Sequence, residues 1–106
     1  DVGCPWVTQY DFWRELCYFH KYVGVSNKFA LYSATALSAE MAGIGAITGT
    51  IEEGKSADMI FTTENPLENL QALENIKTVI VRGEIIDNPR NKINKKIKRE
   101  LDKYII

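Results

Sequence analysis

Hydrophobic side chains near the start of the chain recur every three or four residues, and this spacing predicts a helix. Phe12, Leu16, Phe19 and Val23 fall on one face of an amphipathic helix that we place over residues 9–22. This aromatic-rich element is therefore expected to bury one side against the rest of the chain.

A second helix is predicted over residues 27–42, immediately after a break in the first. Gly24 ends the first helix, and the Ser26 hydroxyl can accept a hydrogen bond from the free N–H groups that open the next one. Most of its side chains are small, which allows another helix or a sheet to approach closely. We expect this helix to be largely buried, with gaps filled by Phe29, Leu37 and Met41.

Short apolar runs separated by turn residues predict three strands, over residues 57–62, 78–82 and 84–87. A brief helix is expected between the first two strands, because leucines there would face one way: Leu67, Leu70 and Leu73. The order helix, helix, strand, helix, strand, strand, helix gives an α+β fold with a helix pair, a small β-sheet and a C-terminal helix. The strands are too few to close a barrel within this chain.

The C-terminal tail has a different charge from the rest of the chain. Residues 1–89 hold six basic and twelve acidic side chains, whereas residues 90–106 hold seven basic and two acidic ones. Its apolar residues form a narrow stripe on an otherwise basic helix: Ile93, Ile97, Leu101 and Tyr104. Lys98 and Asp102 can pair one helical turn apart. We expect a solvated helix that docks through its isoleucine stripe and is electrostatically separate from the rest.

Composition narrows the class of protein. The chain has 106 residues, of which 45% are hydrophobic and 25% charged, as in one globular domain or a piece of a larger one. No apolar run reaches the ~18–20 residues that a membrane-spanning helix needs. Two cysteines and no Asn-x-Ser/Thr acceptor give no sign of a secreted disulfide scaffold, so a cytoplasmic protein is expected. The chain begins with Asp1 rather than Met, which suggests that it is cut from a longer one.

Residues 49–56 match the phosphate-loop pattern G-x-x-x-x-G-K-S/T letter for letter. A phosphate loop needs a helix after it, whose N–H groups receive the anion, but the pattern here predicts a strand. Glu52 and Glu53 would also place negative charge in a loop meant for a polyphosphate. We therefore interpret the segment as a turn.

Two binding functions remain as alternatives. Asp1, Cys4, Cys17 and His20 could supply zinc ligands, although their spacing is unusual and a cysteine in an aromatic helix is more often a small buried side chain. The helix pair with its basic tail could form a nucleic-acid-binding two-helix module. The second helix argues against that module, because it offers few side chains that could contact base edges.

Short motifs of two to three residues occur in three stretches of the chain. The chain opens with Asp1-Val2-Gly3. The predicted helix pair carries Glu15-Leu16, Gly24-Val25-Ser26, Ala30-Leu31 and Ala34-Thr35. The segment leading through the strands carries Gly49-Thr50-Ile51, Gly54-Lys55, Ala57-Asp58, Asn65-Pro66-Leu67 and the run from Val79 to Ile86. Together these motifs resemble the C-terminal end of the amidohydrolase superfamily, in particular its imidazolonepropionase-like and prolidase-like members. The tail from Asn88 onward lies outside the resemblance.

The resemblance implies a parent enzyme built as a (β/α)8 TIM barrel with a small β-sandwich domain. Residues 1–45 would then be the end of barrel strand 8 and the following helix pair. Residues 46–88 would be the C-terminal part of the small β domain, and residues 89–106 a basic amphipathic tail helix. A full barrel takes about 250 residues, so this chain would supply only the last part.

The resemblance also implies the chemistry. Asp1 would be the catalytic residue and a metal ligand, accepting a proton from the attacking water at a divalent metal, with zinc as the expected ion. The other ligands, a His-x-His pair, a bridging Lys or Glu and two further histidines, would come from earlier strands. The parent enzyme would hydrolyse an amide-like or cyclic C–N bond. The isolated chain is expected to bind no cofactor and to be inactive.

Partners follow from the same argument. The missing N-terminal part of the enzyme would be the main partner of this chain. Without it, apolar faces would be uncovered and self-association is expected. Neither nucleic acid nor a membrane is expected as a partner.

Overall fold

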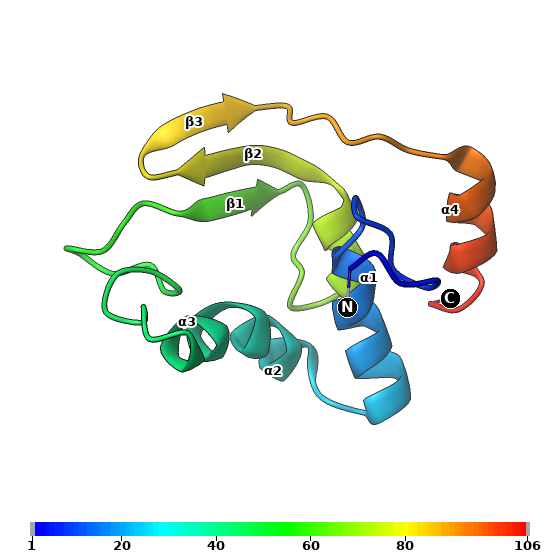
Figure 1. Cartoon of the computed structure of the whole chain (residues 1–106), viewed down its shortest axis with the longest axis horizontal. Coiled ribbons are helices and arrows are strands. Elements are labelled where there is room, and N and C mark those ends of the chain that lie inside the picture. The colour runs from blue at the N-terminus through cyan, green and yellow to red at the C-terminus, as the bar shows by residue number, and fades with distance from the viewer. Residues whose placement is uncertain (1, 106) are drawn as a thin grey trace.

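A computed structural model describes residues 2–105, and it has a helical layer facing a small antiparallel sheet (Figure 1). The C-terminal helix lies at one end of the molecule, beside the N-terminal segment. The α+β class is confirmed. The elements in chain order are α1 (Trp13–Tyr18), η1 (Phe19–Val23), α2 (Asn27–Tyr32), η2 (Ser33–Leu37), α3 (Ser38–Met41), β1 (Met59–Thr62), η3 (Leu70–Glu74), β2 (Ile76–Val81), β3 (Glu84–Asp87) and α4 (Lys95–Asp102).

The first predicted helix is confirmed with a later start. α1 continues directly into the π-helical turn η1 and ends at Gly24, whose φ of 86° is the left-handed conformation that glycine adopts easily. Residues 9–12 form no regular helix. They belong to a turn in which the Thr8 hydroxyl donates to Asp11 Oδ1 at 2.6 Å, and short polar side chains of this kind favour turns and caps over helix interiors.

The second predicted helix is also present, as α2, η2 and α3 in succession. Ser26 caps it as expected, because its hydroxyl oxygen accepts from the backbone N–H of Phe29 at 3.0 Å. Hydroxyls inside the helix bind carbonyls of the preceding turn, with Thr35 donating to Leu31 at 2.7 Å and Ser33 to Ala30 at 2.8 Å. Such bonds compete with the regular α-helical pattern and accompany the π-helical turn η2.

The expected burial of this second helix is wrong. Only Ala30 and Ala39 are buried, whereas Phe29 is exposed and Met41 is 80% exposed. Small residues permit close approach, but this chain covers the helix on one side only. The remaining faces are left without a covering element among residues 2–105.

The sheet has the order β1-β2-β3, with both pairs antiparallel. β3 is confirmed at the predicted residues, while β1 starts two residues later and β2 two residues earlier than expected. The turn between β2 and β3 consists of Arg82 and Gly83, with φ of 50° and 80°. Two positive φ values in a two-residue loop match the right-handed twist of a hairpin.

Asp58 connects this hairpin turn to the loop before β1. Its Oδ1 accepts the backbone N–H of Arg82 at 2.8 Å, and its Oδ2 accepts the Thr48 hydroxyl at 2.8 Å. The Arg82 N–H, followed by hydroxyl donors, lowers the pKa of the Asp58 carboxyl below its usual value. The Ala57-Asp58 motif therefore has a structural role in the sheet.

The core lies where α1, α2 and η3 meet. Leu70 and Leu73 of η3 are buried against Leu16, Cys17 and Ala30. The predicted brief helix is thus a 3-10 helix that starts at Leu70, where the Asn69 side chain accepts from Gln71 N at 3.0 Å. Leu67 lies before it and is exposed, which contradicts the expected leucine face.

The tail helix α4 is shorter than its apolar stripe suggests. Asn94 caps it by accepting from the N–H groups of Lys96 and Ile97. Leu101 is buried, but Ile97 and Ile93 are exposed, so docking through an isoleucine stripe is wrong. Within residues 2–105 no helix is long and apolar enough to cross a membrane.

Candidate functional site

Asp1, the predicted catalytic and metal-binding residue, lies outside the described residues. The segment that follows it forms a tight turn, in which the Gly3 N–H donates to the Val7 carbonyl at 2.8 Å and the Val7 N–H to the Cys4 carbonyl at 3.2 Å. The Val7 side chain is buried. The Tyr18 hydroxyl on α1 donates to the carbonyl of Trp6 in this turn at 3.0 Å. The turn is therefore held to the helical layer.

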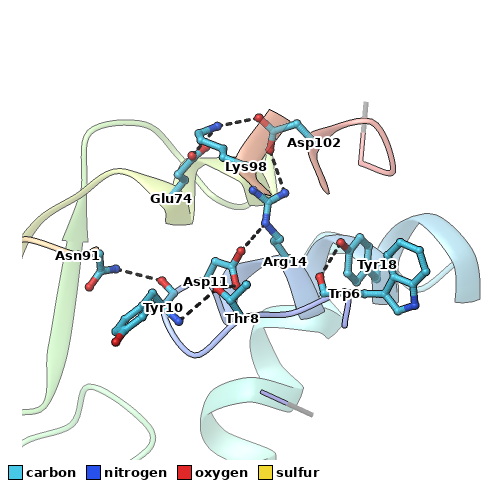
Figure 2. Close-up of polar contacts among 10 residues, drawn as sticks. All are labelled: Trp6, Thr8, Tyr10, Asp11, Arg14, Tyr18, Glu74, Asn91, Lys98 and Asp102. Atoms are coloured by element: carbon cyan, nitrogen blue, oxygen red, sulfur yellow. Dashed lines mark hydrogen bonds and ion pairs between the residues drawn. The ribbon is translucent and has the colours of Figure 1, made fainter. Parts of the chain in front are cut away.

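A chain of charged side chains joins α1, η3 and α4 (Figure 2). Arg14, only 1% exposed, donates from Nε to Asp11 Oδ2 at 2.6 Å, and its Nη1 lies 2.8 Å from Asp102 Oδ1. Lys98 Nζ lies 2.7 Å from Asp102 Oδ2 and 2.8 Å from Glu74 Oε1. The predicted pair of Lys98 and Asp102 is confirmed, but the tail is not electrostatically separate, because its charges pair with α1 and η3.

The pKa values of the network follow its pairing. Burial alone would lower the pKa of the Arg14 guanidinium, but the bonds to Asp11 and Asp102 outweigh it and the pKa is raised. Burial would raise the pKa of Asp102, but Lys98 and Arg14 outweigh it and the pKa is lowered. Bonds to Asp102 and then Glu74 raise the pKa of Lys98. All three shifts favour the charged forms, so the network acts as a structural connection.

Of the four candidate zinc ligands, Asp1 lies outside the described residues, and the structure does not bring Cys4, Cys17 and His20 together. Among residues 2–105, no three His, Cys, Asp or Glu side chains could hold a metal ion. Cys17 is buried in the core, and burial raises the pKa of its thiol to about 11. Cys4 is exposed, and His20 Nδ1 lies 2.7 Å from the Val25 carbonyl oxygen. The interpretation of Cys17 as a small buried side chain is therefore confirmed.

The interpretation of residues 49–56 as a turn is confirmed. Lys55 Nζ donates to the Gly45 carbonyl at 2.8 Å and to the Thr50 hydroxyl at 2.6 Å, and it lies 2.7 Å from Glu52 Oε2. The chain continues toward β1, with no helix directly after the loop to receive a phosphate. The lysine therefore serves the loop itself.

An apolar groove of about 460 Å³ opens between the helical layer and the sheet. Its walls come from the helices α1, α2, η2 and η3, the strands β1 and β2, and the segments before α1 and α4. They include Phe12, Trp13, Leu31, Ile60 and Val79. Large apolar side chains also project elsewhere from the surface, among them Tyr22, Val23, Met41, Ile47, Ile51 and Ile85. Exposed apolar surface of this extent is typical of a face that another polypeptide covers.

Arg14 was not identified from the sequence. Asp11 and Arg14 stand three residues apart, which is a weak signal for a helix-surface pair. The partner that explains the burial of Arg14, Asp102, lies at the other end of the chain. No local pattern relates the two.

Comparisons with known proteins agree on the family. The model of the amidohydrolase family matches residues 9–86. A solved structure described as a "putative prolidase" from Bifidobacterium longum is 40% identical with a TM-score of 0.89, covering 95% of this chain and 25% of that one. A Xaa-Pro dipeptidase with bound methionine in its active site is 36% identical with a TM-score of 0.68, covering 72% and 18%. No curated protein matches the chain.

The share of each chain that these matches cover shows two things. The chain spans about a quarter of the length of the prolidase-described structure. A match over 95% of the chain must also include most of residues 89–106, beyond the end of the family match at residue 86. The tail is thus part of the shared fold.

Proposed function

Because this chain belongs to the amidohydrolase family, we propose that it forms the C-terminal part of a metal-dependent hydrolase that cleaves an amide-like or cyclic C–N bond. The supporting observation is the match over 95% of the chain, at 40% identity, to a protein described as a prolidase. A second similar structure is described as a Xaa-Pro dipeptidase. The first substrates to test are therefore dipeptides with proline in the second position.

The rest of the enzyme supplies the (β/α)8 barrel and the remainder of the small β domain. Residues 1–45 form the end of barrel strand 8 and the helix pair, residues 46–88 belong to the small β domain, and residues 89–106 are the tail. The apolar groove between the two layers and the exposed side chains of α2 and α3 support this arrangement. Their natural cover is the N-terminal part of the same enzyme.

Asp1 is the residue of this chain proposed to act in the reaction. A carboxylate at the end of a barrel strand faces the active site of such an enzyme and can accept the proton of an attacking water. Members of the family generally use divalent metal ions. Residues 2–105 do not fit such an ion on their own, since no three suitable side chains meet among them. The metal ligands besides Asp1 are therefore assigned to the remainder of the enzyme, with zinc as the ion to test first.

The isolated chain has neither the barrel nor the metal ligands that are assigned to the rest of the enzyme, and its behaviour follows from this. The isolated chain is catalytically inert, holds no metal and self-associates through its uncovered apolar faces. The enzyme is cytoplasmic and binds neither nucleic acid nor membranes.

Elemental analysis and a hydrolase assay test this proposal on matched samples. The isolated chain is expected to contain no stoichiometric zinc and to hydrolyse no Xaa-Pro dipeptide. The longer protein that includes the upstream barrel is expected to contain zinc and to hydrolyse the dipeptide. Stoichiometric metal or turnover in the isolated chain would contradict the division of the site. Light scattering is expected to give a mass above that of a 12.0 kDa monomer, and a monomer would refute self-association.

A further inference from the structure

The C-terminal tail contacts the segment that follows Asp1. The rings of Tyr104 and Trp6 meet edge to face with centroids 4.9 Å apart, and aromatic pairs favour this arrangement. Asn91 Nδ2 donates to the carbonyl of Tyr10 at 3.2 Å (Figure 2). The two ends of the chain are thus joined at both Trp6 and Tyr10.

The tail is itself held firmly on the helical layer. The Tyr22 hydroxyl donates to the Tyr104 carbonyl at 2.7 Å, so the backbone that carries the Tyr104 ring is fixed to η1. Asp102 is paired with the buried Arg14 on α1, and the adjacent Leu101 is buried. The backbone that carries the Tyr104 ring is therefore fixed to the helical layer.

Residues 2–10 are held by the buried Val7 side chain and by the Tyr18 bond to Trp6, and the tail adds the contacts at Trp6 and Tyr10. These residues contain no helix, and their regular pairing is one isolated bridge between Cys4 and Val7. Trp6 is held through its carbonyl by Tyr18, and through its ring by Tyr104. Removing the Tyr104 ring would leave the Trp6 ring without its aromatic partner.

We infer that the C-terminal tail is a clamp on residues 2–10, and that Tyr104 is a positioning residue for the Asp1 carboxylate of the hydrolase. This inference rests on the proposed function, because Asp1 acts only there. Val2 is bonded directly to Asp1, so a shift of the turn would also shift the Asp1 carboxylate, which is the proposed proton acceptor. A misplacement of about 1 Å in a reacting group can cost on the order of 100-fold in rate.

Three substitutions test the clamp in two assays. Tyr104→Ala removes the ring contact, and Tyr104→Phe keeps it. The matched control is Tyr32→Ala, which removes a tyrosine of similar exposure, 44% against 42%, that contacts Phe29 on α2. The first assay is hydrogen exchange of residues 2–10 in this chain, and the second is hydrolysis of a Xaa-Pro dipeptide by the longer enzyme.

In Tyr104→Ala, the amides of Gly3 and Val7 are expected to exchange about three- to tenfold faster, as befits the loss of one aromatic contact. In the enzyme, kcat falls about tenfold or more with KM within about twofold, because Asp1 acts in the chemical step and not in substrate binding. Tyr104→Phe restores both values, and Tyr32→Ala changes neither.

Each contrary result overturns a different part of the inference. Unchanged exchange in Tyr104→Ala overturns the clamp, whatever the activity. Faster exchange with unchanged kcat in an active enzyme overturns the positioning role. A wild-type enzyme that hydrolyses no Xaa-Pro dipeptide overturns the proposed substrate class and with it the positioning role, while the exchange data still decide whether the tail clamps the turn.

Discussion

Replacing Asp102 by asparagine should destabilise the chain measurably, because this carboxylate is shared by two cations. Its Oδ1 lies 2.8 Å from Arg14 Nη1 and its Oδ2 lies 2.7 Å from Lys98 Nζ. Asparagine keeps the shape of the side chain but removes the charge. Arg14 would then lose one of two anionic partners in a site where it is 1% exposed.

The expected loss is about 2 kcal/mol of the free energy of unfolding. A hydrogen bond to a charged group contributes about 1.5–3 kcal/mol, and a fully broken buried pair costs about 3–5 kcal/mol. The lower figure applies here because Arg14 retains Asp11 and Lys98 retains Glu74. At about 4–8 °C per kcal/mol for a chain of this size, the melting temperature falls by about 8–16 °C.

Urea unfolding followed by circular dichroism at pH 7 measures this loss. Protein concentration must be matched, since association raises apparent stability. Glu100→Gln is the control, because it breaks an exposed pair between Glu100 of α4 and Lys103, which directly follows that helix. Such pairs contribute about 0–1 kcal/mol. The reasoning is refuted if Asp102→Asn loses no more than Glu100→Gln.

The same variant should alter the acid dependence of stability. Because the pKa of Asp102 is lowered in the folded state, its contribution is complete above the unfolded value of about 3.9. It is lost as pH falls through the lower folded pKa. The stability difference between wild type and Asp102→Asn should therefore shrink below about pH 4, and a constant difference down to acid unfolding would contradict the pairing.

Two further predictions concern the glycines and the cysteines. A Cβ at Gly49 would lie 2.5 Å from the Ala39 Cβ, whereas one at Gly54 meets nothing within 4 Å, and both residues have positive φ. Urea unfolding should therefore show Gly49→Ala to be about 1–3 kcal/mol less stable than Gly54→Ala, and equal losses would contradict the close approach. The exposed Cys4 should react with a thiol reagent at pH 8 well before Cys17, whose pKa is raised to about 11 by burial. Peptide mass spectrometry distinguishes the two, and equal labelling of the folded chain would refute the burial of Cys17.

Local patterns predicted the elements that depend on local physics. Helical spacing of apolar residues, Gly24 in a left-handed turn and the Ser26 cap located the helix pair within a few residues. The β-branched run before Arg82-Gly83 located the hairpin. These signals are carried by neighbouring residues, so no knowledge of the rest of the fold is needed.

Features that depend on distant residues were missed. The burial of Arg14 and the docking of α4 arise from pairing between opposite ends of the chain, which periodicity does not encode. The burial of the second helix was overestimated because its small residues indicate close packing without indicating whether the packing partner is in the same chain. Asp1 was identified by resemblance alone, since a single terminal carboxylate carries no pattern of its own.

The most direct test of the proposed function is the rate of Xaa-Pro dipeptide hydrolysis by the longer enzyme, compared with its Asp1→Asn variant. If Asp1 accepts the proton of the attacking water, kcat should fall by about 10²–10⁴ in the variant. A variant that retains the wild-type rate would show that the active site of this hydrolase does not depend on the carboxylate at the start of this chain.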